Sequence, residues 1–204
     1  MTELYEPKFR SRRYISRTRD LESVVRRLAE VHGWTLAFER PADSQQGIGI
    51  ALIWEIIVGL TVAYYDEPRV QVSCLIARSA RHLSEVREYE AFLTRRLDLL
   101  DVSELLAAPS LAEPGSKAEV LSLLRLGFGA PVEFDQRYFD RLSSAMRAAN
   151  SEIRDAALRG MNYTEWPQFR PVLQQVAKRD SNRSVRKLAK RILTIFNRLE
   201  LVDS

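Results

Sequence analysis

The spacing of apolar residues changes about halfway along the chain, from patterns typical of a mixed domain to patterns typical of helices. In the first half, Leu21, Val25 and Leu28 form a helical stripe that ends at Gly33, a residue suited to a helix C-terminus. Short apolar or alternating runs predict strands at residues 14–15, 34–38, 50–57, 60–65 and 70–76. With a second helix capped by Ser84, this half predicts an α+β domain that has a mainly antiparallel sheet and two helices.

The second half shows helical spacing throughout. Ser116 and Glu119 form a capping-box pattern before an apolar run, and Gly127 and Gly129 are expected to end that helix. Four further helices are predicted, with starts near residues 135, 151, 164 and 182. Since Pro109, Pro114 and Gly115 interrupt both patterns, two domains are expected at residues 1–108 and 115–204.

Two of the predicted helices repeat one pattern: an apolar residue, Arg, two residues, Ala, three residues, then Met or Leu. The two copies lie 32 residues apart, at Ile153, Arg154, Ala157 and Met161 and again at Val185, Arg186, Ala189 and Leu193. A fixed offset between about 20 and 50 residues is typical of stacked helical repeats.

This pattern resembles HEAT-like repeats, including the short bacterial type, over roughly residues 116–199. The resemblance implies an all-α HEAT-like helical-repeat domain that presents one surface to a partner. It also implies that Arg154 and Arg186 bind a carbonyl or an acid in the turn. Asp180 matches the acidic residue that the family places before the second helix, whereas the first copy has Asn150 nearby. A generic helical bundle is the alternative, because apolar residues and Ala at helix crossings occur in any bundle.

The net charge of +4 is concentrated near the C-terminus. Residues 178–198 hold eight Lys or Arg and one acid, whereas the remainder holds 23 basic and 26 acidic residues. On the last helix, one side is apolar and the other carries the candidate partner-binding residues Arg183, Lys187, Lys190, Arg191 and Arg198. The simplest interpretation is a solvated face, followed by a site for an acidic protein and then one for nucleic acid. Nucleic acid ranks last because no aromatic residue accompanies the cations.

Trp166 is a sixth candidate for partner binding, because exposed aromatic side chains often dominate interfaces. It lies in the sequence Tyr-Thr-Glu-Trp-Pro, at a turn between the predicted repeats. The more common alternative is that such a residue packs between helices.

Residues with catalytic or metal-binding chemistry are few. The only histidines, His32 and His82, have no Cys, Asp or Glu at metal-ligand spacing. Cys74, the only cysteine, alternates with apolar residues and is predicted to be buried. A nucleophile pair of Cys74 and His82 is disfavoured by strand geometry and by the lack of a third partner. We therefore expect no catalytic residue, no metal and no cofactor.

These patterns predict a non-catalytic protein-binding module, such as an adaptor, regulatory or immunity-like protein. A nucleic-acid-binding protein that uses the same basic face is the first alternative, and an enzyme with a pocket between the two domains is the second. A single cysteine and the lack of a signal peptide predict a cytoplasmic location. No membrane span is expected, because Glu55 and Gly59 interrupt the most apolar run. The oligomeric state stays open.

Overall fold

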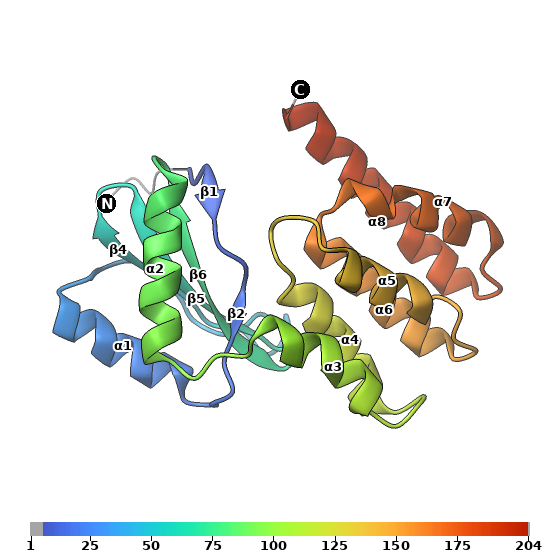
Figure 1. The fold of residues 1–204 in the computed structure, drawn as a ribbon, viewed down its shortest axis with the longest axis horizontal. Helices are drawn as coiled ribbons and strands as arrows, with labels where there is room; N and C mark the ends of the chain where they lie inside the picture. The colour runs from blue at the N-terminus through green and yellow to red at the C-terminus, as the bar shows by residue number, and fades with distance from the viewer. Residues whose placement is uncertain (1–5, 204) are drawn as a thin grey trace. The chain divides into compact units, whose positions relative to one another are not determined.

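The computed structural model describes residues 6–203, with side chains up to residue 198. The chain divides into two compact units, Met1–Asp101 and Val102–Ser204 (Figure 1). This division falls earlier than the boundary that we predicted between residues 108 and 115.

The first unit is built on one antiparallel sheet. Its strands follow the order β1-β6-β5-β4-β3, and β2 also pairs with β6. The bounds of its strands and helices are β1 Phe9–Arg10, β2 Tyr14–Ile15, α1 Leu21–His32, β3 Thr35–Arg40, β4 Ala51–Ile57, β5 Leu60–Glu67, β6 Val72–Ser79 and α2 Leu83–Arg96. The predicted α+β class, with its antiparallel sheet and two helices, is confirmed.

The core of this unit lies between α1, α2 and one face of the sheet. Because side chains alternate along a strand, Leu52 and Trp54 of β4 point to the same face as Val62 of β5 and Leu75 of β6. These four side chains belong to one buried cluster with residues of both helices, including Val25 of α1. Figure 1 shows α1 and α2 covering this face.

One local prediction in the first unit was wrong, and one strand was not predicted. Helix α2 begins at Leu83, so Ser84 lies inside it and does not cap it. The amides of Arg81 and His82 donate instead to the hydroxyl of Ser79, at 2.9 and 3.1 Å. Strand β1 escaped prediction because two residues are too few to show a period.

The second unit is all-helical in its described part. Its elements are α3 Val102–Leu111, α4 Lys117–Phe128, α5 Gln136–Ala145, α6 Ser151–Thr164, the 3₁₀ turn η1 Pro167–Phe169, α7 Arg170–Arg179 and α8 Arg183–Asp203. Consecutive helices pack as the pairs α3/α4, α5/α6 and α7/α8, and the second helix of each pair packs on the next second helix (Figure 1).

Side-chain caps define most of the helix starts in the second unit. The hydroxyl of Ser116 accepts the amide of Glu119 at 3.2 Å, and Asp135 and Asn150 cap α5 and α6 in the same way. Thr164, in contrast, is the last residue of α6 and does not begin the next helix. The 3₁₀ turn lies between it and α7.

Helix α3 occupies a segment that we expected to be a linker. Pro109 lies inside this helix, although proline removes a backbone hydrogen bond from a helix interior. Leu105 and Pro109 are both buried and α3 packs on α4, so burial of apolar surface compensates for the lost bond. The helical unit therefore begins at Val102, before the start at residue 115 that we predicted.

Gly127 does not end α4, which continues to Phe128. Gly127 lies against Gly160 of α6, and a Cβ added to it would collide with the Gly160 backbone. A Cβ added to Gly160 would lie 2.8 Å from Cδ2 of Leu142 and 3.1 Å from the carbonyl oxygen of Leu123. The two helices thus cross with main chain against main chain.

The packing of the two repeat copies agrees with the predicted offset. Ala157 on α6 and Ala189 on α8 are both 0% exposed. Lys190, the next residue on α8, is exposed. The predicted helix phase is therefore confirmed, whereas membership in the HEAT-like family stays a prediction.

Candidate functional site

The exposed side of α8 carries the five cations identified in the sequence. Arg183, Lys187, Lys190, Arg191 and Arg198 are all exposed. The opposite side of α8 is buried through Val185, Ala189, Ile192 and Phe196. At about 100° and 1.5 Å per residue, the five cations occupy an arc of about 100° that extends for about 22 Å along the helix. We refer to these five residues as the α8 face.

The charge of the α8 face is not neutralised within the described part of the chain. No Asp or Glu occurs between Arg183 and Arg198. None of the five side chains has a hydrogen-bond or ion-pair partner among residues 6–198. Cations three or four residues apart on a helix repel one another, so an anionic partner surface would relieve this repulsion.

Arg154 is buried and has a structural role. It is only 7% exposed, and its Nε and Nη2 donate hydrogen bonds to Oδ2 and Oδ1 of Asp180 at 2.8 and 2.9 Å. Its Nη1 donates to the carbonyls of Ala148 and Ala149, both at 2.8 Å. These hydrogen bonds from Arg154 hold the pKa of the Asp180 carboxyl below its usual value.

Arg186, the equivalent residue in the second copy, binds the turn before α8. Its Nη1 donates to the carbonyl oxygens of Asp180 and Ser181, at 2.5 and 3.0 Å. Both motif arginines therefore have the role that the resemblance implied for them. Arg154 also ties the segment before α6 to the segment before α8, and we refer to its ion pair with Asp180 as the repeat clamp.

Trp166 is a core residue, so the hypothesis that it anchors a partner as an exposed side chain is wrong. It is 4% exposed, and its Nε1 donates to the carbonyl of Val132 at 3.0 Å. Its ring stacks against Phe169 and meets Phe134 edge-on, with centroids 6.1 and 5.4 Å apart. The alternative, packing between helices, is confirmed.

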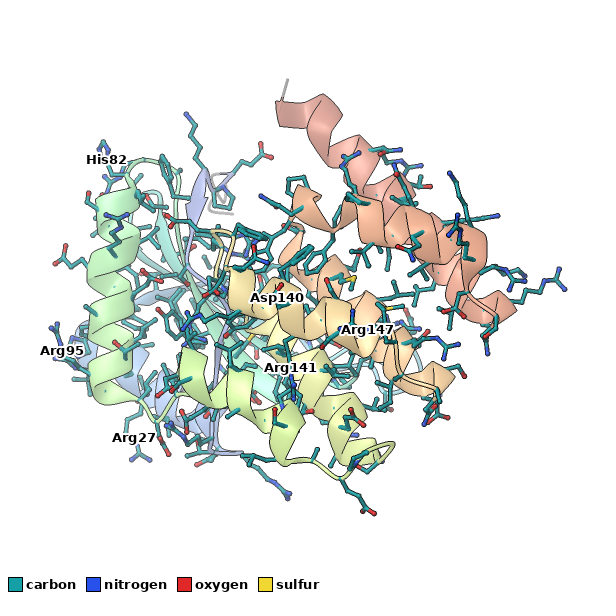
Figure 2. The ribbon with its side chains drawn as sticks, turned by 45° about the vertical axis from the view of Figure 1, so that its right-hand side comes forward. Arg27, His82, Arg95, Asp140, Arg141 and Arg147 are labelled. Atoms are coloured by element: carbon teal, nitrogen blue, oxygen red, sulfur yellow. The ribbon has the colours of Figure 1, made fainter. Side chains whose placement is uncertain are left out.

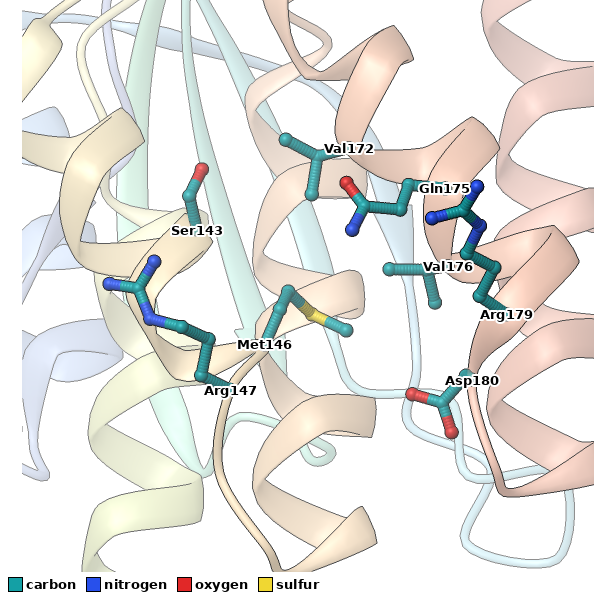
Figure 3. Close-up of a pocket in the computed structure, with 8 residues that line it drawn as sticks. All are labelled: Ser143, Met146, Arg147, Val172, Gln175, Val176, Arg179 and Asp180. Carbon is teal, nitrogen blue, oxygen red and sulfur yellow. The ribbon is translucent and has the colours of Figure 1, made fainter.

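A groove that the sequence reasoning missed lies between α5 and α7 (Figure 3). Its cavity volume is about 360 Å³. We refer to it as the α5–α7 groove, and its lining residues are Ser143, Met146, Arg147, Val172, Gln175, Val176, Arg179 and Asp180. A more open hollow of about 450 Å³ adjoins α5 and shares Ser143 and Arg147 with the groove.

The 32-residue offset of the second helices does not extend to the helices that form this groove. Tyr138 and Leu142 of α5 are buried, whereas Arg170 and Gln174, 32 residues further on, are half-buried and exposed. The groove therefore has no repeating sequence signal, and only the packing of α5 beside α7 reveals it.

The adjoining hollow has fewer charged side chains without a partner than the groove has. Arg137 forms an ion pair with Asp135, and Arg141 donates to the hydroxyl of Ser110. Asp140 accepts a hydrogen bond from Gln136 at 2.7 Å. Figure 2 shows Arg141 on α5 and Arg147 in the turn that follows it, and of these two only Arg147 lacks a side-chain partner among the described residues.

The described residues do not form a catalytic or metal-binding group of the kinds considered. Cys74 is fully buried, and burial raises the pKa of its thiol to about 12, so the thiolate is not formed at neutral pH. His82 is exposed before the first turn of α2 (Figure 2). Within residues 6–203, no three His, Cys, Asp or Glu side chains are grouped to hold a metal ion.

No helix in the described part of the chain is both long and apolar enough to cross a membrane. No family model matches the chain, and neither a curated protein nor a solved structure shows significant similarity to it. Evidence on function therefore comes from the surfaces of the molecule itself.

Proposed function

We propose that this chain is a non-catalytic protein-binding module that holds an acidic surface of a partner protein against the α8 face. The observation that supports this proposal is the row of five exposed cations with no acid among them. Such a row accelerates association with an acidic partner and favours that partner over neutral ones. An adaptor, a regulator or an immunity-like protein in the cytoplasm would use the face in the same way.

Nucleic acid is the alternative partner, because a row of cations about 22 Å long also suits a phosphate backbone. The α8 face has no aromatic side chain between Arg183 and Arg198 on its exposed arc. Proteins that hold single strands usually stack bases on such side chains, and here that contribution is missing. We therefore favour the acidic protein.

The test reverses three charges at the centre of the face, in the variant Lys187→Glu, Lys190→Glu, Arg191→Glu. The matched control reverses three exposed cations of the first unit, Arg27, Arg87 and Arg95, which likewise have no partner among the described residues. Both variants change the net charge by the same amount, so only the position of the charge differs between them.

Proteins captured from a lysate of the native source on the immobilised chain are identified and purified, and their affinities are measured by calorimetry. We expect an acidic protein whose affinity falls at least tenfold in the α8 variant and stays within twofold in the control. Capture of no protein that depends on these three residues would contradict the proposal. Binding to a duplex DNA that weakens steeply between 50 and 200 mM salt would instead favour the alternative.

A further inference from the structure

We infer that the α5–α7 groove is a second binding site, which takes a peptide segment that places a carboxylate beside an apolar side chain. The groove shares no residue with the α8 face. This inference therefore goes beyond the proposed function and does not depend on it.

The apolar part of the groove comes from both of its walls. Figure 3 shows Met146, after the end of α5, pointing across the groove toward Val172 and Val176 of α7. The two valines are four residues apart and lie on the same side of α7. Met146 and Val172 are only partly buried, so an apolar side chain placed between the walls would remove more of their surface from water.

The charged part of the groove selects an anion. Arg147 and Arg179 line the two walls, and neither side chain has a partner among the described residues. Asp180 also lines the groove, but both of its carboxylate oxygens accept hydrogen bonds from Arg154. With two arginines and one aspartate, the lining has a net charge of +1. Guanidinium groups bind carboxylates in a planar, bidentate geometry, which gives direction as well as attraction.

Two uncharged polar groups in the groove suit a peptide backbone. Gln175 offers an amide that can both donate and accept hydrogen bonds. The Oγ of Ser143 is shielded from solvent and has no hydrogen-bond partner among the described residues. Ser143 belongs to α5 and Gln175 to α7, so each wall of the groove contributes one uncharged polar group that suits the main chain of a peptide.

The combination of features favours a peptide over a free anion or a nucleic acid. A free anion would make no use of Met146 and the two valines, and bases would find no aromatic ring among the lining residues. A volume of about 360 Å³ is at the small end of the range for ligand pockets, which suits two or three residues of a chain.

The test begins with selection of random heptapeptides displayed on phage against the immobilised full-length chain. We expect the enriched peptides to place Asp or Glu within two positions of Leu, Ile, Met or Phe. A synthetic, fluorescein-labelled copy of the most enriched peptide then gives a Kd by fluorescence anisotropy.

Variants assign the binding to the groove. The double variant Arg147→Glu, Arg179→Glu is expected to weaken the peptide at least tenfold, and Val172→Asp to weaken it similarly. Lys178→Glu is the control for charge reversal on α7 and is expected to stay within twofold, because Lys178 is exposed beside Arg179 but does not line the groove. Circular dichroism checks that each variant is folded.

Four outcomes would overturn the inference. The first is the absence of an acidic–apolar pattern among the enriched peptides. The second is a peptide that binds the double variant as tightly as it binds the wild type. The third is displacement of the labelled peptide by free acetate as effectively as by the unlabelled peptide, which would indicate an anion site only. The fourth is loss of peptide binding in the variant of Lys187, Lys190 and Arg191, which would assign the peptide to the α8 face.

Discussion

Replacement of Arg154 by Met is expected to destabilise the helical unit by about 3–5 kcal/mol, the range for breaking one side of a buried ion pair. Methionine keeps most of the volume but removes the two bonds to Asp180 and the two bonds to the carbonyls of Ala148 and Ala149. The Asp180 side chain is 6% exposed, so water cannot fully replace the lost guanidinium.

The matched control is Arg159→Met, which breaks an exposed pair with Asp155 one turn further along α6. These two side chains are 47% and 35% exposed, and such a pair contributes about 0.5 kcal/mol or less. Urea denaturation followed by circular dichroism measures both free energies of unfolding. A loss below about 1 kcal/mol for Arg154→Met would refute the view that the repeat clamp is a buried, well-formed ion pair.

The pH dependence gives a second check on the same ion pair. Arg154 lowers the pKa of the Asp180 carboxyl in the folded protein, whereas an unfolded Asp has a pKa of about 3.9. The stability from this group is therefore fully present above the unfolded pKa and is lost as the pH falls through the lower, folded pKa. The gap in stability between wild type and Arg154→Met should narrow as the pH falls below about 4. A gap that stays constant between pH 7 and pH 2.5 would contradict the assignment.

Three further predictions test the packing of each unit. Ala189→Leu should cost about 1–3 kcal/mol by overpacking, whereas Lys190→Leu should change the melting temperature very little because its side chain is exposed. Gly160→Ala should destabilise the helical unit in urea titrations, because its Cβ would lie 2.8 Å from a methyl group of Leu142; an unchanged midpoint would contradict the tight crossing. The thiol of Cys74 should not react with a disulfide reagent at pH 8 in the native protein and should react fully in urea, since burial raises its pKa to about 12.

The fold was predictable where local signals and tertiary packing agree. Helix α1 has both an amphipathic stripe and Gly33, which adopts the left-handed conformation with φ of 66°. Helix α3 was not predictable, because Pro109 normally argues against a helix interior and only burial against α4 outweighs it. The prediction that Gly127 ends α4 was wrong for a similar reason. A glycine near the end of a helical pattern usually indicates a helix end, and only its contact with Gly160 in the folded chain explains it here.

The candidate surfaces differ in predictability for a geometric reason. All five residues of the α8 face lie on one helix, so the period of 3.6 residues alone places them together. The groove needs two helices, and its shape depends on how α5 and α7 are spaced. The burial of Trp166 could not be predicted from its neighbours in the sequence, because it depends on how the rings of Phe134 and Phe169 pack around it in the folded chain.

The crossing of Gly127 and Gly160 has a consequence for how the helical unit would bend. Because main chain lies directly against main chain at this crossing, few side chains can rearrange there, and we expect α4 and α6 to move together. The next contact, between α6 and α8, is made by side chains, which can change rotamers, and is tied at one end by the buried repeat clamp. We therefore expect bending at this second contact, where it would displace α8 relative to α4 and α6.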